Sequence, residues 1–372
     1  KVSALRQAVV LTRRYLDLVF RDKLLLTVLM AIMPIIAMLL LIISKRNWLV
    51  GDSPTEITRQ LNLDLAGPGS SATYAIVGNS QLLLFMMSLA AVLLGIFAAV
   101  YEIIKERSVY RRERMVSLRL VPYLGSKAVV LTAFALVQCL LFLVVIGLKV
   151  DLPDEGVFLP ATVEMYITLV LSTAAAIMLG LLISAVVPNS NTVIYVVLLV
   201  LFFQIIFAGV IFNLPGIAGS LSNLTLTRWS MEALGTSANM EYLNGLTRTR
   251  FLPEEITKEI SMNVERPADD WEPVTVITET REVAVPCPSG VVLTVPITVP
   301  QVTENEMVTV TETVTKSVTV NPEPLDVFKQ QEFRIDYDRS IAHLFKDWLI
   351  LMGFGAVFGL ATALVLKSKD VG

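Results

Sequence analysis

The sequence has few of the side chains on which disulfide and metal chemistry depend, since its 372 residues include 2 Cys and 1 His. Two cysteines cannot form the disulfide framework of a small secreted protein, and Cys/His zinc sites need more ligands than are present. Cys139 falls in an apolar run and Cys287 in a polar segment, so we predict that they do not pair. We also predict no metal site.

Charged residues are scarce as well, because they make up 17% of the chain, whereas hydrophobic residues make up 54%. A soluble domain is about 25% charged and about 45–50% apolar. The sequence also lacks a G-x-x-x-x-G-K-[ST] phosphate loop, an H-E-x-x-H motif and a G-x-S-x-G motif. These absences argue against a water-soluble enzyme, and we predict no catalytic residue and no cofactor in this chain.

Long uncharged runs are abundant. Six of them reach the length of about 20 residues that a transmembrane helix needs, at 24–43, 81–100, 128–148, 165–187, 193–212 and 348–366. A helix satisfies its own backbone hydrogen bonds in lipid, which an open sheet cannot do. The sequence therefore predicts an all-α polytopic membrane protein with six transmembrane helices.

The segment 1–23 precedes the first run and has amphipathic spacing. Leu5, Val9, Leu16 and Phe20 recur near helical intervals, with basic residues on other faces. Two interpretations remain open: a cytosolic helix that packs against a neighbouring domain, or a helix that lies flat on the membrane surface.

Basic residues indicate the orientation of the runs. Segment 1–23 holds six Lys/Arg and segment 102–127 holds seven, whereas segment 149–164 has one Lys against four Asp/Glu. Lys and Arg are enriched in cytoplasmic loops. We therefore expect a multi-pass protein of the cell membrane with both termini in the cytoplasm.

The connection at 213–344 has ten Lys/Arg against nineteen Asp/Glu and no run long enough to span. Its second half alternates Val and Thr, as at Val308-Thr309-Val310-Thr311, which is typical of strands. We predict a β-rich extracellular insertion at 273–321. The alternative is a low-complexity Val/Thr stalk.

The inner loop carries the most specific pattern, at Glu106-Arg107-Ser108-Val109-Tyr110-Arg111-Arg112-Glu113-Arg114, followed by Arg119, Tyr123 and Lys127. It resembles the coupling-helix region of G-subfamily ABC exporters of the type-2 permease class, whose pattern is E-R-x-x-F-x-x-E-R followed by Y-R-x-x-x-Y and a Lys. One aromatic residue before Arg119 is missing, and the loop is one residue shorter.

Two further stretches resemble the same family. Residues 207–214 are similar to its F-S-G-x-x-x-N-L, and residues 227–234 are similar to its P-R-Y-x-x-x-A-L. The opening segment, which ends in Arg21-Asp22-Lys23, resembles the family's connecting helix. The resemblance covers about 1–235 and the last run, so that 236–343 reads as an insertion.

The resemblance implies four regions: a connecting helix at 1–23, spans one to five at 24–212 with a coupling helix near 106–119, an extracellular segment at 213–344, and span six with a cytosolic tail at 345–372. It implies a nucleotide-binding domain as partner, which would hold ATP and Mg, and a second permease copy in a homodimer or heterodimer. Membrane lipid is expected as a partner and nucleic acid is not.

The resemblance also implies roles for individual residues. Those expected to couple the chain to the ATPase domain are Glu106, Arg107, Tyr110, Arg111, Glu113 and Arg114. Those expected at the substrate cleft, between spans two and five, are Leu94, Phe202, Gln204 and Ile205. From the sequence alone, the amide of Gln204 is expected to hydrogen-bond within the helix packing more often than to contact a ligand. Val210 and Ile211 are expected to form an outer valve.

The function expected from the resemblance is the permease domain of an ATP-driven exporter that moves a hydrophobic or lipid-like substrate by alternating access. The chain begins at the connecting helix, so we expect either the membrane half of a fused transporter or a separate permease subunit. The alternative function is a membrane-anchored receptor or scaffold that acts through its acidic extracellular segment.

Overall fold

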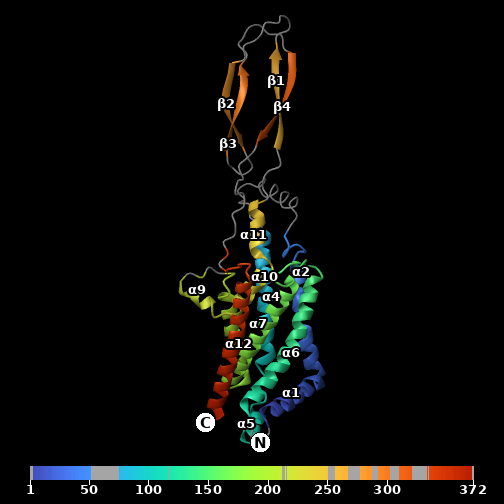
Figure 1. Cartoon of the computed structure of the whole chain (residues 1–372), viewed down its shortest axis with the longest axis vertical. Coiled ribbons are helices and arrows are strands. Elements are labelled where there is room, and N and C mark those ends of the chain that lie inside the picture. The colour runs from blue at the N-terminus through green and yellow to red at the C-terminus, as the bar shows by residue number, and fades with distance from the viewer. Residues whose placement is uncertain are drawn as a thin grey trace. The chain divides into compact units, whose positions relative to one another are not determined.

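The structure is a computed structural model that describes residues 3–51, 75–116, 118–211, 214, 216–249, 333 and 335–370 and four strands between 256 and 320. The chain divides into two compact units, one at 1–51, 74–246 and 330–372 and one at 52–73 and 247–329. The first contains the membrane helices and the second contains the strands (Figure 1). Cys287 and residues 302–309, on which two of our predictions depend, lie outside the described residues.

Five helices in the described part of the chain are long and apolar enough to cross a membrane. They are α2 (Lys23–Ile43), α4 (Ala75–Ala99), α6 (Leu120–Gly147), α7 (Ala161–Val186) and α12 (Ile341–Asp370). Each corresponds to a predicted run but begins earlier, because the helices continue through charged residues at their ends such as Lys127, Glu164 and Asp347. The protein is therefore a multi-pass membrane protein, as the sequence predicts.

The run at 193–212 differs from its prediction. It forms α8 (Ser190–Ile206), a helix of 17 residues that stops six residues before the predicted end. The backbone turns at Gly209, whose φ of +81° is a left-handed conformation that ends regular helix and that glycine adopts without steric cost. Val210 and Ile211 consequently lie in the turn that follows the helix, and their predicted position inside it was wrong.

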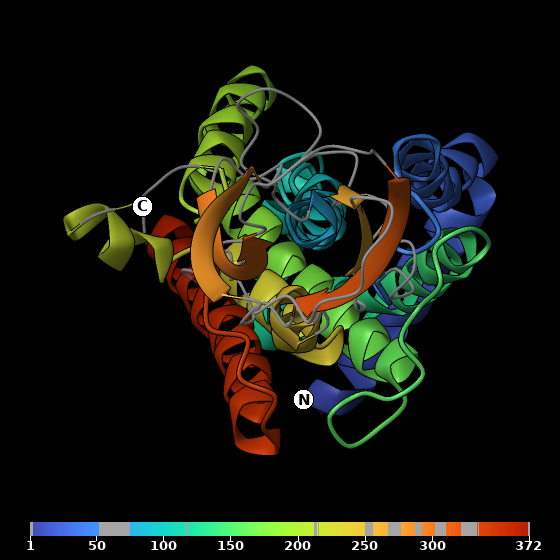
Figure 2. The ribbon, with the colours of Figure 1, turned by 90° about the horizontal axis from the view of Figure 1, so that it is seen from above.

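Helices α4 and α7 lie side by side (Figure 2), and small residues bring the last turns of α4 close to α7. A Cβ atom at Gly180 of α7 would lie 2.7 Å from the backbone oxygen of Ile96 and 2.9 Å from Ala99 Cβ on α4. Gly95 of α4 faces α7 with equally little room. Such small residues allow helix backbones to approach each other closely in a membrane.

Two glycines of α12 lie against α7. A Cβ atom at Gly355 would lie 3.6 Å from Ala175 Cα, and one at Gly359 would lie 2.6 Å from Met178 Cε. The Gly-x-x-x-Gly pair in the last predicted run therefore forms a packing face. Helix α7 thus lies between α4 and α12, while α6 packs against α2 and α7.

Four shorter helices complete this unit at its two ends. Helix α5 (Arg107–Val116) lies near the end of α12, at the same end as both termini (Figure 1). Helices α9 (Ile217–Ser222), α10 (Leu226–Ser237) and α11 (Met240–Thr249) follow α8. Helix α10 packs against α4, α7 and α12. The coupling segment predicted at 106–119 is therefore helical over most of its length.

Helix α1 (Ala4–Arg21) packs along α6 with Tyr15 and Val19 buried. Ser3 caps its N-terminus by accepting a hydrogen bond from the Arg6 backbone N–H. Of the predicted apolar stripe, Leu5, Val9 and Phe20 are more than half exposed, whereas Leu16 is partly buried against the core that contains Tyr15 and Val19.

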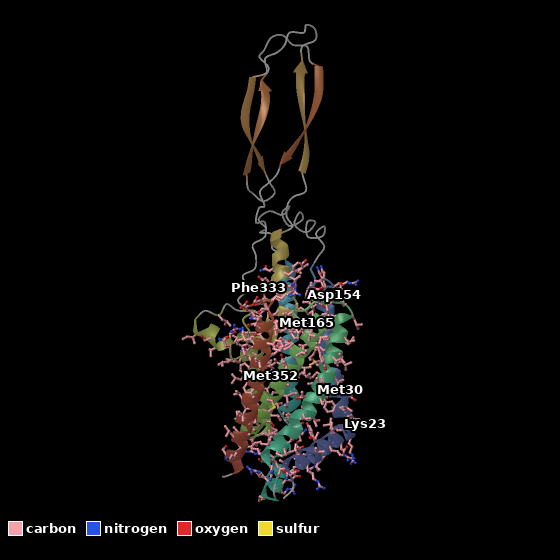
Figure 3. The ribbon with its side chains drawn as sticks, viewed as in Figure 1. Lys23, Met30, Asp154, Met165, Phe333 and Met352 are labelled. Atoms are coloured by element: carbon pink, nitrogen blue, oxygen red, sulfur yellow. The ribbon has the colours of Figure 1, made fainter. Side chains whose placement is uncertain are left out.

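The labelled charged and apolar side chains occupy different levels of the helical unit (Figure 3). Lys23 and Asp154 lie toward opposite ends of the helices, and Met30, Met165 and Met352 lie between them (Figure 3). This separation of charge from the middle of the helices is the pattern that a bilayer requires.

The second unit contains two antiparallel strand pairs. Strand β1 (Ile256–Arg266) pairs with β4 (Val310–Val320), so that Ile256 is opposite Val320. Strand β2 (Ile277–Pro286) pairs with β3 (Val292–Gln301), so that Pro286 is opposite Val292. The second pair is nested within the first along the sequence. Strands β2, β3 and β4 fall within the predicted range 273–321, although Val308 and Thr309 lie outside the described residues, and β1 lies before the predicted start at 273.

Candidate functional site

The turn that joins α4 to α5 is fixed to the end of α7 by hydrogen bonds. Ser184 Oγ on α7 accepts bonds from the backbone N–H groups of Ile103, at 3.0 Å, and Ile104, at 3.1 Å. Arg107, the first residue of α5, donates to the backbone oxygen of Pro188 at 2.9 Å. These bonds join the segment around the start of α5 to the end of α7 and to the α7–α8 connection.

A buried lysine joins the same turn to α6. The Nζ atom of Lys127 lies 3.1 Å from Glu102 Oε2 and 2.8 Å from Glu106 Oε2, and the side chain of Lys127 is 3% exposed. Its ammonium also lies 4.5 Å from the centre of the Tyr15 ring on α1, which is a cation–π contact. One charged group thus connects α1, α6 and the segment before α5.

The carboxylate of Glu102 is stabilised in its charged form. Burial opposes its ionisation, but the ammonium groups of Lys127 and Lys105 outweigh burial and hold the pKa of Glu102 below its usual value. Burial and the nearby carboxylate of Glu102 both raise the pKa of the Tyr15 hydroxyl. The carboxylate of Glu102 is therefore ionised at neutral pH, and the Tyr15 hydroxyl beside it is neutral.

Helix α1 contacts α5 from the other side. Arg14 donates to Glu113 Oε1 at 2.7 Å, and Gln7 Oε1 accepts a hydrogen bond from the backbone N–H of Arg119. Both side chains of the Arg14–Glu113 pair are partly exposed, so we expect this ion pair to contribute at most about 1 kcal/mol. Its main effect is to fix the position of α1 relative to α5.

The structure gives each predicted coupling residue a position. Glu106, Arg107 and Glu113 bond within the chain as described, and Tyr110 is 5% exposed with its ring 4.9 Å from that of Tyr123. Arg114 donates to the backbone oxygen of Leu118. Of the predicted set, Arg111 is the residue with an exposed side chain.

The exposed side of α5 consists of Ser108, Arg111, Arg112 and Met115, and we call it the open face of α5. These positions are three or four residues apart, so they lie on one side of a helix. The sequence pattern missed Arg112 and Met115, because the family motif includes neither. It also missed Glu102 and Ser184; the grouping of Glu102, Lys105 and Glu106 at the end of an apolar run is a signal that could have indicated the first.

The predicted cleft residues fall into two groups. Leu94 and Gln204 are 4% and 3% exposed, and Gln204 Oε1 accepts hydrogen bonds from the backbone N–H and the hydroxyl of Thr227. Phe202 is 61% exposed and Ile205 is partly exposed, both on α8. Of the predicted valve residues, Ile211 is about half exposed and Val210 is partly exposed.

Comparison with known proteins places these features in a family. The sequence profile of the ABC-2 type transporter family matches residues 6–236, which contain α5 and the buried charges around Lys127. The ABC transporter ATP-binding/permease protein Rv1747 of Mycobacterium tuberculosis is 25% identical over 162 residues, which are 42% of this chain and 19% of that protein. The chain thus spans about a fifth of the length of this relative. Because the profile covers more than half of the sequence, the chain belongs to the ABC-2 type transporter family and contains its membrane-spanning permease domain.

Proposed function

We propose that this chain is the permease of an ATP-driven exporter that moves a hydrophobic or lipid-like substrate out of the cytoplasm or the inner leaflet. The sequence has no phosphate loop, so a fused or separate nucleotide-binding domain would hold ATP and Mg, and this chain would convert the motion of that domain into transport. The uncharged helices support an apolar class of substrate.

The observation that carries the proposal is the two-sided character of α5. Its open face is accessible, while other side chains of α5 contact Arg14 of α1, Tyr123 of α6 and Pro188 in the α7–α8 connection. A helix that is exposed on one side and held by such contacts on the other is suited to receive a force and pass it on.

The contacts of α5 give the path of that force. The hydrogen bonds to Ser184 and Pro188 connect the α5 region to α7, which packs against α4 and α12. The ion pair of Glu106 with Lys127 connects the same region to α6. Closure of the nucleotide-binding domains would move α5 and tilt these helices together. ATP shifts such an equilibrium only if the partner contacts the two states differently, and the open face of α5 is where we place that difference.

We further propose that α8 is a sixth, shorter span and that two copies of the permease enclose the substrate cleft. Phe202 and Ile205 are accessible on α8 and would line the cleft. Leu94 and Gln204 are buried within the copy and would maintain its shape. Val210 and Ile211 would close the outer end from the turn after α8.

The same proposal orients the chain. Both termini and α5 would lie in the cytoplasm, where basic loop residues are favoured, and the strand-containing unit would be extracellular. The exposed Leu5, Val9 and Phe20 would place α1 on the membrane surface, with Tyr15 against α6.

Site-specific photo-crosslinking of the full-length protein tests the proposal. A photoreactive amino acid at Met115, which is 81% exposed on the open face of α5, should crosslink to the nucleotide-binding domain, with a yield that changes when ATP is added. The matched control is the same probe at Leu148, which is 77% exposed after the other end of α6. This position should give no such crosslink.

The outcome separates the exporter from the alternative. A membrane-anchored receptor or scaffold has no ATPase that binds α5. It would therefore give equal, ATP-independent crosslinking from the probes at Met115 and Leu148. That result would overturn the proposed function.

A further inference from the structure

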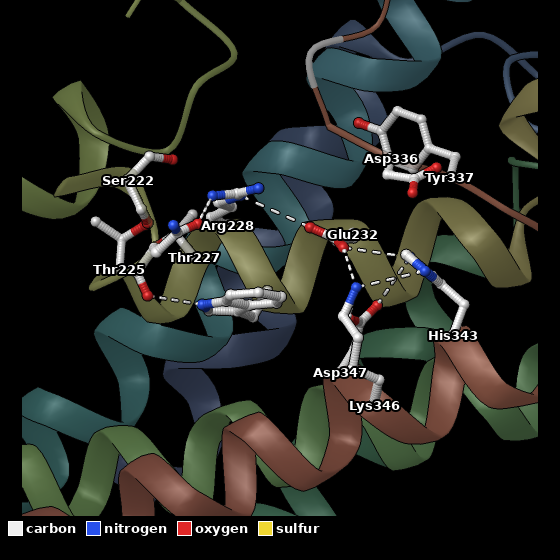
Figure 4. Close-up of polar contacts among 12 residues, drawn as sticks. Ser222, Thr225, Thr227, Arg228, Glu232, Asp336, Tyr337, His343, Lys346 and Asp347 are labelled. Atoms are coloured by element: carbon white, nitrogen blue, oxygen red, sulfur yellow. Dashed lines mark hydrogen bonds and ion pairs between the residues drawn. The ribbon is translucent and has the colours of Figure 1, made fainter. Parts of the chain in front are cut away.

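A second charged cluster lies at the end of α12 opposite α5, where the first turns of α12 meet α10. It contains Glu232 from α10 and His343 and Asp347 from α12, whose side chains point toward one another (Figure 4). His343 and Asp347 are four residues apart and therefore share one face of α12. All three residues are more than nine-tenths buried, with exposed fractions of 1%, 8% and 0%.

The distances in this cluster match those between the ligands of a small metal ion. His343 Nε2 lies 3.2 Å from Glu232 Oε1 and 3.6 Å from Asp347 Oδ2. One ligand atom from each residue lies within 4.8 Å of the other two. In a tetrahedral site with bonds of about 2.0–2.1 Å, ligand atoms are about 3.3 Å apart. Little movement is needed for all three residues to reach one ion.

In the part of the chain that the structure describes, several polar atoms of this cluster lack hydrogen-bond partners. Among the described residues, neither oxygen of the fully buried Asp347 accepts a hydrogen bond, and His343 Nε2 has no hydrogen-bond partner. Buried polar groups without such partners are rare and indicate a missing ligand, water or catalytic role. The lone pairs that are left over all belong to groups that bind metal ions.

Two cationic side chains lie near the cluster, but they do not supply the missing hydrogen bonds. Lys346 Nζ is 3.3 Å from Glu232 Oε1 and 3.8 Å from Asp347 Oδ1, and Arg228 Nε is 3.7 Å from Glu232 Oε2. The side chain of Lys346 is 47% exposed, so it can move into solvent. Its ammonium would leave when a divalent ion supplies the positive charge.

We propose that Glu232, His343 and Asp347 form a binding site for a divalent transition-metal ion of the zinc type. An imidazole nitrogen with two carboxylate oxygens suits zinc better than magnesium, which prefers oxygen ligands alone and retains several waters. Three protein ligands leave one position for water. A bound ion would join α10 to the start of α12. This site is independent of the proposed transport function and contradicts our sequence prediction that the chain has no metal site.

Zinc binding to the purified full-length protein tests the site, with the metal alone as the probe. We expect one zinc ion per chain by elemental analysis after dialysis against buffered zinc, and a thermal shift with zinc that magnesium does not produce. His343→Ala and Asp347→Asn should each weaken binding at least tenfold. Lys346→Gln should bind as tightly or more tightly, because it removes the competing ammonium.

Two further variants distinguish loss of the site from loss of the fold. Asp338→Asn changes a nearby carboxylate outside the cluster, which accepts a hydrogen bond from Ser340, and should bind zinc normally. His343→Cys replaces the imidazole with a softer ligand and should shift the preference toward cadmium. Absence of bound zinc from both the wild type and Lys346→Gln, or equal binding by Asp347→Asn and the wild type, would overturn the site.

Discussion

The Nζ atom of the buried Lys127 lies 2.8 Å from Oε2 of the partly exposed Glu106, so an ion pair joins the first turns of α6 to the residue that precedes α5. Glu102 contacts the same ammonium at 3.1 Å. Each carboxylate is four residues from the other and 21 or 25 residues from the lysine in the sequence. The permease therefore anchors its proposed coupling helix through charges that are shielded from water.

Substitution of Lys127 by Met should strongly destabilise the protein. It leaves two carboxylates without their buried partner, and loss of one member of a buried pair costs about 3–5 kcal/mol. Thermal unfolding of the purified protein in detergent measures the effect. The control is Lys105→Met, because Lys105 pairs with the same Glu102 but is 43% exposed, and it should cost at most about 1 kcal/mol. Equal melting temperatures for the two variants would contradict the role of Lys127.

Acidification should remove the stabilisation that Glu102 provides. Although burial opposes its ionisation, Lys127 and Lys105 lower the pKa of Glu102, so its contribution is present above the unfolded value of about 4.3 and is lost as the pH falls through the folded pKa. Between about pH 5 and pH 3, the melting temperature of the wild type should therefore fall further than that of Glu102→Gln. Parallel curves for the two proteins would show that this carboxylate does not titrate with folding.

Charge reversal at Glu113 should impair coupling through α1. Glu113→Arg places two arginines together where Arg14 now donates at 2.7 Å, and we expect lower ATP hydrolysis by the full-length protein in lipid nanodiscs, with little change in melting temperature. The double variant Arg14→Glu/Glu113→Arg restores an ion pair and should recover most of the activity. If the double variant stays as inactive as the single one, Glu113 acts through a partner and not through Arg14.

Gly180→Ala should destabilise the contact between α4 and α7. Its Cβ would meet the Ile96 oxygen and Ala99 Cβ on the facing helix, and overpacking of this kind costs about 1–3 kcal/mol. Gly353→Ala is the matched control, because no atom lies within 4 Å of the position of its Cβ. We expect its melting temperature to be unchanged or slightly raised. A similar decrease in melting temperature in both variants would mean that loss of helix flexibility, and not close packing, explains the effect.

The sequence predicted the membrane helices well because bilayer thickness fixes their length. Five uncharged runs became spanning helices, and the coupling segment at 106–119 became α5. The residues at which the helices begin and end were less predictable. Helices α6 and α12 continue through Lys127 and Asp347, since tertiary partners permit charges that an apolar window excludes. Helix α8 is shorter than predicted, because Gly209 turns the chain.

The candidate site was predicted as a segment but not as a set of contacts. The motif indicated Glu106, Arg107 and Glu113, and the structure shows that their side chains bond within the permease, while Arg112 and Met115 share the open face with Arg111. A motif records which residues occur together and carries no information on the direction in which each side chain points.

The sequence by itself thus determined that the chain is a multi-pass membrane protein, because the length and spacing of apolar runs follow from the thickness of the bilayer. Only the tertiary structure decided which charges are paired. Glu102 meets Lys127, and Glu232 meets His343 and Asp347, across segments that are far apart in the sequence. Such contacts depend on how the helices pack and rotate against one another, and the pattern along a single helix does not specify either.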